Sequence, residues 1–173
     1  MKRPIHLYIL VALSTIASVL RIQSTFFTTF DEAQYRALFE GAEIEGVDNL
    51  VAMAKAGAAF STNIINKVLT ILLVLLLVAT IVFLFKKANE RASYTYIAYL
   101  FGTLIYFTYS YIGGLQVSKN FETAELHQLT KSGALVGYGI NIALFALYFG
   151  LTVFFLLRKP KETPNMGQTS TDI

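Results

Sequence analysis

The sequence contains no cysteine, and only 14% of its 173 residues are charged. Without cysteine the chain has no disulfide framework, no thiolate metal site and no cysteine nucleophile. The scarcity of charge, the hydrophobic share of 55% and the positive mean hydropathy lie outside the usual range of a soluble domain of this size. These features predict a protein whose solvent is largely lipid.

Catalytic signatures are absent as well. The sequence contains no P-loop, nucleophile elbow, HExxH motif or Rossmann fingerprint. Its two histidines, His6 and His127, are expected on opposite sides of a membrane, where they cannot share a metal ion. We therefore predict no enzyme, no catalytic residue, no metal and no cofactor.

The formal net charge of +3 does not indicate a nucleic-acid partner, because the basic residues flank apolar runs instead of clustering on one face. The chain also lacks Asn-x-Ser/Thr sequons, which together with the lack of cysteine fits a bacterial plasma membrane better than the secretory pathway. The expected partners are the lipid bilayer and either another membrane protein or a second copy of the chain.

Four long apolar runs dominate what the sequence does contain, and each is long enough to cross a bilayer. Strands in hydrocarbon would leave backbone groups unsatisfied, so helices are favoured. Residues 1–160 are expected to form one transmembrane domain, and residues 161–173 a disordered cytoplasmic tail. The sequence predicts an all-α integral membrane protein with four transmembrane helices at about residues 4–22, 64–85, 92–115 and 133–157.

The first apolar run also has features of a signal peptide, since Ser14 and Ala17 are small residues of the kind found at cleavage sites. The run is long for the apolar region of a signal peptide. We therefore expect it to be retained as the first transmembrane helix.

The Lys and Arg residues at the ends of the runs fall on one side of the membrane when four crossings are assumed. They lie before the first run, around Lys86–Arg91 between the second and third runs, and after the fourth run from Arg158 onward. Because cytoplasmic loops carry an excess of Lys and Arg, both termini and the short second loop are predicted to be cytoplasmic.

Residues 23–63, between the first two spans, form an extracytoplasmic segment that is long for a loop without structure. The run Thr29-Phe30-Asp31-Glu32 matches a capping box, so an amphipathic helix is expected to follow it on the membrane surface. Asp48 can cap a second helix, which either continues into the second span or kinks near Ser61–Asn63.

Acidic residues gather in this outer segment at Glu40, Glu43, Glu45 and Asp48. Clustered carboxylates suit a hard divalent cation, but their spacing matches no calcium-binding loop. A solvated acidic patch, on the side of the membrane where positive charge is avoided, is the favoured interpretation.

The third predicted span contains six tyrosines, three toward each end. Tyrosine in the headgroup region keeps its hydroxyl group wet, so two interfacial belts are the favoured interpretation. The alternative is a polar-aromatic face that lines a groove, because four residues recur at steps of three and four: Tyr99, Gly102, Tyr106 and Tyr109.

The fourth predicted span carries a small-xxx-small pattern followed by polar residues on later turns. Glycines let helix backbones approach, and a buried asparagine can form a hydrogen bond across a helix interface. The pattern predicts a packing face, either within the chain or against another chain, formed by Gly133, Gly137, Asn141 and Tyr148.

His6, Arg21 and Lys67 lie near the ends of the predicted spans, where their polar groups can reach the headgroups. No ionisable residue is therefore expected deep in the membrane. This argues against a proton-coupled pump or a voltage sensor.

Topology alone does not imply function. The leading hypothesis is a non-catalytic accessory subunit of a larger membrane complex, such as a transporter or envelope machine, which docks through the fourth-span glycines and the outer helical segment. The alternative is a small homo-oligomeric transporter, channel or lipid-handling protein with a path lined by Tyr99, Tyr106, Tyr109 and Asn141. A third hypothesis is an immunity protein against a membrane-active peptide.

Overall fold

A computed structural model describes residues 5–40, 46–118 and 124–158 of the chain, and every regular element in these ranges is an α-helix. The all-α prediction is therefore confirmed for the described residues. The predicted tail at 161–173 lies outside them. The helices are α1 (Ile5–Phe26), α2 (Glu32–Ala37), α3 (Val47–Ser61), α4 (Ile64–Phe85), α5 (Asn89–Ser118) and α6 (Ala124–Leu157).

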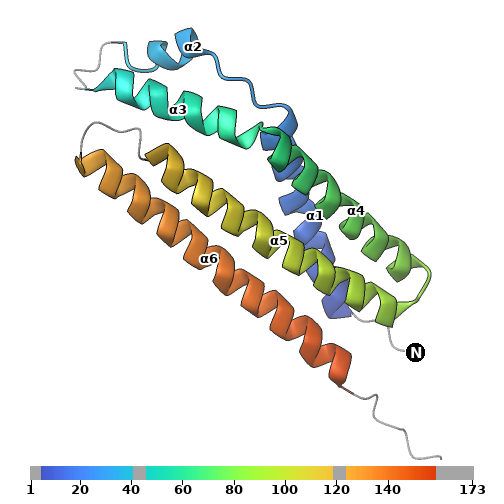
Figure 1. Cartoon of the computed structure of the whole chain (residues 1–173). Helices are drawn as coiled ribbons and strands as arrows, with labels where there is room; N and C mark the ends of the chain where they lie inside the picture. Colours follow the sequence, from blue (N-terminus) through green and yellow to red (C-terminus); the bar gives the residue numbers. More distant parts are fainter. Residues whose placement is uncertain (1–4, 41–45, 119–123, 159–173) are drawn as a thin grey trace, which may run out of the picture.

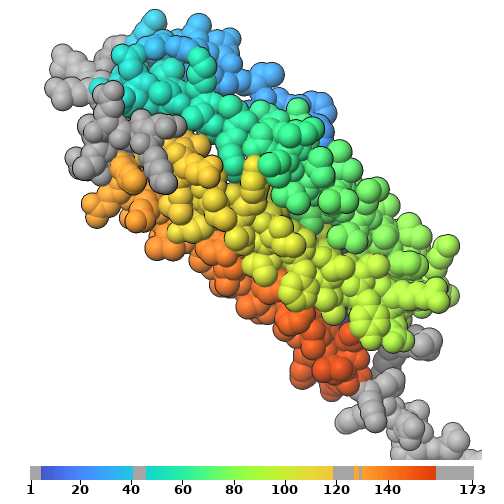
Figure 2. Space-filling model, viewed as in Figure 1, coloured from blue at the N-terminus to red at the C-terminus, as the bar shows by residue number. Residues whose placement is uncertain are grey.

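The four long helices lie side by side as a bundle (Figure 1). α4, α5 and α6 run in alternating directions with α5 in the middle, and Figure 2 shows them forming one continuous face. α1 packs on α4 behind this layer. It also meets α6 near its own N-terminus, where the rings of His6 and Phe155 stack with centroids 4.0 Å apart. α3 leads into α4 and lies alongside the outer half of α5, and α2 packs on α3 (Figure 1).

Three segments of the described residues are long and apolar enough to cross a membrane: α1, α4 and Thr130–Leu157 of α6. They coincide with three of the four predicted spans and support an integral membrane protein. α5 contains the predicted span 92–115 but does not reach the same hydropathy, because tyrosine, threonine, serine and glycine fill much of its sequence.

The core of the bundle lies where α1, α4 and α5 meet. α6 has fewer buried residues, since only 6% of its most apolar stretch is buried, against 28% in both α1 and α4. α6 contributes partly buried aromatic rings, such as Phe145 and Phe149, that pack against this core. The buried core residues are Leu7, Leu10, Val11, Leu73, Leu77, Leu84, Ala92, Tyr96, Tyr99 and Leu100.

The turn between α4 and α5 explains why these helices are antiparallel neighbours. The Lys87 N–H donates to the Leu84 carbonyl and the Ala88 N–H to the Phe83 carbonyl, both at 3.0 Å. This is the Schellman pattern of a helix C-terminus, and Lys87 takes the left-handed conformation (φ 57°) that it requires. The chain therefore reverses between Phe85 and Asn89 without a longer loop.

The break between α3 and α4 settles whether residues 48–85 form one helix. Asn63 caps α4 with its side chain, which accepts the Asn66 N–H at 2.8 Å. The Asn66 amide in turn donates to the Phe60 carbonyl at 2.6 Å and so satisfies the end of α3. Two asparagines thus bond the exposed backbone groups of both helix ends, and the kinked alternative is the one observed.

Phe60 fastens α3 to the outer part of α5. Its ring stacks on Tyr109 with centroids 5.3 Å apart, and the Tyr109 hydroxyl group accepts a hydrogen bond from the Asn63 amide at 3.1 Å. A Cβ added at Gly113 would overlap the Phe60 ring. Glycine at 113 therefore makes room for the aromatic anchor of α3.

We expect Gly113→Ala to destabilise the protein by roughly 1–3 kcal/mol, because overpacking would push Phe60 and α3 away from α5. Adding Phe60→Ala to the same chain should reduce this penalty. Gly133→Ala is the matched control, since a Cβ there meets nothing within 4 Å. Thermal unfolding in detergent measures the effect, and equal stabilities of the Gly113→Ala and Gly133→Ala proteins would contradict the docking of Phe60.

Candidate functional site

Two pairs of hydroxyl groups join α1 to α5 through the core. Ser14 Oγ and Tyr96 OH are 2.9 Å apart, and Ser18 Oγ and Tyr99 OH are 3.1 Å apart. All four side chains are buried. Because hydrocarbon offers no alternative partner, these hydroxyl pairs favour one rotation of α1 about its axis relative to α5.

The hydroxyl pairs belong to a longer polar face of α1. Ser14, Ser18, Arg21 and Thr25 recur at steps of four, three and four, and all are buried. Thr25 continues the pattern by placing its hydroxyl oxygen 3.4 Å from that of Thr70 in α4. The first span is thus a helix with one apolar face toward lipid and one polar face toward the protein.

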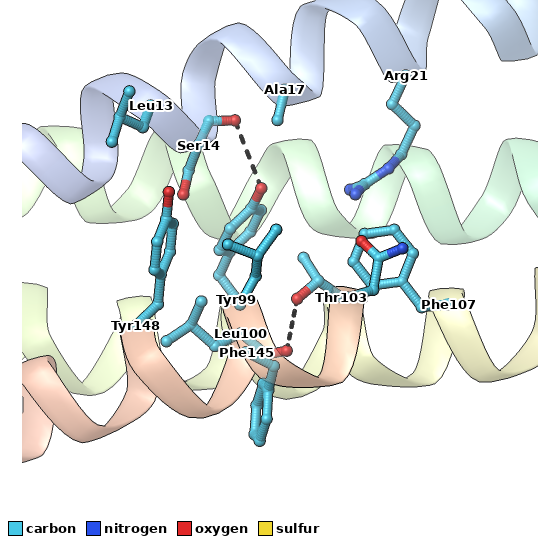
Figure 3. Close-up of a pocket in the computed structure, with 12 residues that line it drawn as sticks. Leu13, Ser14, Ala17, Arg21, Tyr99, Leu100, Thr103, Phe107, Phe145 and Tyr148 are labelled. Carbon is cyan, nitrogen blue, oxygen red and sulfur yellow. Dashed lines mark hydrogen bonds between the residues drawn. The ribbon is translucent and has the colours of Figure 1, made fainter. Parts of the chain in front are cut away.

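A partly enclosed cavity of about 150 Å³ lies between α1, α5 and α6 (Figure 3). Leu13 of α1 and Leu144 of α6 line it and are 47% and 46% exposed, so the cavity reaches the lipid-facing surface between these helices. We call it the Arg21 cavity. Its polar lining residues are Ser14, Arg21, Tyr99, Thr103, Asn141 and Tyr148.

Arg21 is the most unusual residue of this cavity. Its side chain is 9% exposed, and its guanidinium carbon lies 4.5 Å from the centroid of the Tyr106 ring and 5.4 Å from that of Phe107. Figure 3 shows it leaving α1 toward Phe107. The Nη1 atom is buried and has no hydrogen-bond partner among the described residues.

This geometry corrects the expectation that Arg21 reaches the headgroups from the end of its span. α1 continues to Phe26, and Arg21 points inward to Tyr106, which lies near the middle of α5. Charged residues inside transmembrane segments are rare and face the protein interior where they have a function or a partner, and Arg21 is buried within α1, five residues before its end. The spacing of the polar residues on α1 indicates that Arg21 points inward. The predicted end of the span at residue 22 instead placed Arg21 beside the headgroups.

The four residues predicted for a groove on α5 face different neighbours. Tyr99 contacts α1 and lines the Arg21 cavity, whereas Gly102 faces α4, where an added Cβ would lie 2.7 Å from a methyl carbon of Leu73. Tyr106 lies under Arg21, and Tyr109 packs against α3. These residues therefore serve several helix contacts and do not line one groove.

The residues predicted for a packing face on α6 divide into two sets. Asn141 and Tyr148 line the Arg21 cavity, and the Asn141 amide donates to the Gly137 carbonyl at 2.8 Å. An added Cβ at Gly133 or Gly137 would meet nothing within 4 Å. The two glycines therefore make no close contact within the described residues, and the packing face stays a prediction.

Comparison with known proteins places the chain in a family. Residues 1–165 match the family described as Domain of unknown function (DUF8777). The chain belongs to the DUF8777 family. No curated protein and no solved structure matches it.

The outer acids of this DUF8777 chain do not form a metal cluster in the part that the structure describes. Glu40 is exposed, and Asp48 pairs with Arg36 at 2.6 Å, while Glu43 and Glu45 lie outside the described residues. The predicted capping box with Thr29 as its first residue is wrong, because Asp31 caps α2 by accepting two backbone N–H groups.

Ion pairs connect α2 to α3 at this outer surface. Glu32 of α2 accepts from Arg36 at 3.1 Å and from Lys55 of α3 at 3.4 Å. Arg36 also reaches Asp48 of α3, so the four residues form a network between the helices. The hydrogen bonds from Arg36 and then Lys55 lower the pKa of Glu32 below its ordinary value of 4.5.

We expect Tyr96→Phe and Tyr99→Phe each to lower the stability by about 0.6–1.7 kcal/mol, because each leaves a buried serine hydroxyl group without its partner on α5. Tyr94→Phe is the matched control, since Tyr94 is 56% exposed. Unfolding in mixed micelles measures the difference. If all three variants lost the same stability, the hydroxyl pairs would contribute nothing specific.

We also expect the α2–α3 contact to be weakened by acid. The lowered pKa of Glu32 means that its ion pairs stabilise the contact above pH 4.5 and are lost as the pH falls below that value through the lowered pKa. Spin labels on Gln34→Cys and Ala52→Cys report the distance, and the chain has no other cysteine.

The expected distance distribution between these labels is narrow at neutral pH and broad in acid. Glu32→Gln should give a broad distribution at both pH values, whereas Glu40→Gln should behave like the wild-type protein. High salt should weaken the contact as well, because the network is exposed. A distribution insensitive to both pH and Glu32→Gln would show that the ion pairs do not hold α2 on α3.

Proposed function

We propose that the chain crosses the membrane four times and serves as a non-catalytic accessory subunit that binds a partner membrane protein through α6. The crossing by α5 is supported by its place between α4 and α6. These two helices run in the same direction, and α5 returns the chain from the end of one to the start of the other (Figure 1). If α4 and α6 span, α5 spans with them.

The low hydropathy of α5 does not oppose this proposal. Several of its hydroxyl groups are bonded to other helices: Tyr96 and Tyr99 to α1, and Thr108 to Tyr138 of α6 at 3.1 Å. Others bond to the helix itself, as Thr103 does to the Leu100 carbonyl at 2.7 Å. A transmembrane helix can carry such groups when they are satisfied within the protein.

Basic residues at one end of the bundle support the proposed orientation. Lys86, Lys87 and Arg91 lie at the α4–α5 turn, at the same end of the bundle as Arg158 after α6 (Figure 1). By the excess of Lys and Arg in cytoplasmic loops, this end faces the cytoplasm of a bacterial cell. The helices α2 and α3 then lie on the outer side with their network of ion pairs.

The observation that carries the proposed partner is the lack of contact at the α6 glycines. Within the bundle, glycines fit neighbouring side chains closely, as Gly102 fits Leu73 and Gly113 fits Phe60. An added Cβ on α6 meets nothing within 4 Å at four glycines: Gly133, Gly137, Gly139 and Gly150.

Each glycine inside a helix costs about 1 kcal/mol relative to alanine. The glycines that face α4 and Phe60 gain close packing that offsets this cost, whereas those of α6 gain none within the chain. Small residues at a membrane helix surface favour close contact with another helix, so the open stripe of α6 at Gly133 and Gly137 fits a partner helix.

A ligand-handling role is the second candidate, because the Arg21 cavity offers polar groups inside the membrane. It differs from the homo-oligomeric path predicted from the sequence, since Tyr109 packs on Phe60 and does not line this cavity. The cavity lies within one chain, between α1, α5 and α6.

We expect the double variant Gly133→Leu/Gly137→Leu to lose its partner while keeping its own fold, because the added side chains begin in open space in the isolated chain. Gly139→Leu is the matched control, since Gly139 is also open but lies on a different side of the helix. Photo-crosslinking from position Val136 in native membranes, followed by mass identification, measures partner contact, and circular dichroism checks the fold. Equal crosslinking in both variants, or no crosslinked protein in the wild type, would overturn the proposal.

A further inference from the structure

Arg21 has no carboxylate counter-ion within the described part of its own chain. The ion pairs of the described residues involve Arg36 and Lys55 at the outer surface, and none involves Arg21. The apolar segments offer no acid either, because α1, α4 and Thr130–Leu157 contain no Asp or Glu. The acid of α5, Glu90, lies in its first turn, far along the helix from Tyr106.

The guanidinium group is nevertheless held in a defined place. It lies over the Tyr106 ring and beside Phe107, and cation–π attraction to these rings fixes it without using its N–H donors. The buried Nη1 is left without a partner in the described residues. A guanidinium group with free donors binds a carboxylate or phosphate in a two-pronged geometry, and its strength grows where water is excluded.

A second donor lies on the opposite wall of the cavity. The Asn141 amide uses one N–H for the Gly137 carbonyl at 2.8 Å, and an amide group carries two. Both Arg21 and Asn141 line the same cavity between α1 and α6. The polar lining thus offers a cation and an amide donor to one small acceptor group.

The opening of the cavity indicates what kind of molecule can enter it. Leu13 and Leu144, on opposite sides of the seam between α1 and α6, line the cavity and are about half exposed on the surface that faces lipid. Arg21 lies five residues before the end of α1, about 7.5 Å along the axis at 1.5 Å per residue. A molecule that enters from the bilayer can therefore place its head beside Arg21 and leave an apolar tail in lipid.

We propose that the Arg21 cavity binds the head of an amphipathic oxyanion, a carboxylate or phosphate group on an apolar tail, with Arg21 as its counter-ion. The head accepts hydrogen bonds from the Arg21 guanidinium group and the free N–H of Asn141. The tail leaves between Leu13 and Leu144. This site lies on the same side of α6 as Gly133 and Gly137, and its test on the isolated chain does not require the partner proposed there.

The test is a titration of delipidated protein in detergent, followed by native mass spectrometry. Oleate and oleyl alcohol share a tail and differ in charge, so the wild-type protein should bind one oleate per chain at least about tenfold more tightly than the alcohol. Dioleoyl phosphatidate, acetate and inorganic phosphate complete the series. They distinguish a phosphate head from a carboxylate head, and a tailed anion from a free one.

Arg21→Gln should remove the preference for oleate over oleyl alcohol. Arg21→Lys should keep part of the preference, because lysine retains the positive charge but lacks the planar guanidinium group that donates two parallel hydrogen bonds. Lys67→Gln is the matched control, since Lys67 is the basic residue of α4 and does not line the cavity. The wild-type comparison of the two ligands needs no variant, so it stands even if Arg21→Gln fails to fold.

Two outcomes would overturn the proposal. One is equal binding of oleate and oleyl alcohol by the wild-type protein, together with no binding of phosphatidate. The other is an unchanged preference in Arg21→Gln. Binding of acetate or inorganic phosphate as tight as that of the tailed anions would overturn the part of the proposal that assigns a tail.

Discussion

A hydroxyl group inside a bilayer has no water to bond, so each one needs a partner within the protein. The contact between α1 and α5 is built from this requirement. Ser14 and Ser18 on one helix meet Tyr96 and Tyr99 on the other, and none of the four is exposed. Once these pairs form, the polar face of α1 turns inward and carries Arg21 into the bundle, over the Tyr106 ring.

The same requirement divides the helices by role. α4 is almost wholly apolar and packs against α1 and α5, whereas α5 carries more hydroxyl groups than any other helix and lies between α4 and α6. α6 gains little burial from its neighbours and keeps its glycines on the outside. The two proposed roles follow from this arrangement: an outer face suited to another helix, and a cavity with a buried cation that opens between α1 and α6.

The sequence predicted the helices better than their contacts. The helices Ile5–Phe26 and Ile64–Phe85 are recognisable from the length of their apolar runs alone, because a helix needs such a length to cross the hydrocarbon core. Arg21 was assigned to the wrong environment because a span boundary drawn at residue 22 placed it beside the headgroups. The spacing of Ser14, Ser18 and Arg21 carried the correct information, but it becomes decisive only when a partner helix supplies matching hydroxyl groups. Likewise, the sequence does not show that Gly113 is closely packed and Gly133 is not. This difference depends on the position of Phe60, which lies against Gly113 in the folded chain.

We propose that α5 crosses the membrane despite its low hydropathy, because many of its polar groups are bonded within the bundle. Single cysteines at Glu90 and Gln116, near opposite ends of α5, test it directly in a chain that has no other cysteine. With a membrane-impermeant maleimide, we expect Gln116→Cys to react in intact cells and Glu90→Cys to react only after permeabilisation. Reaction of both from the same side would contradict the account.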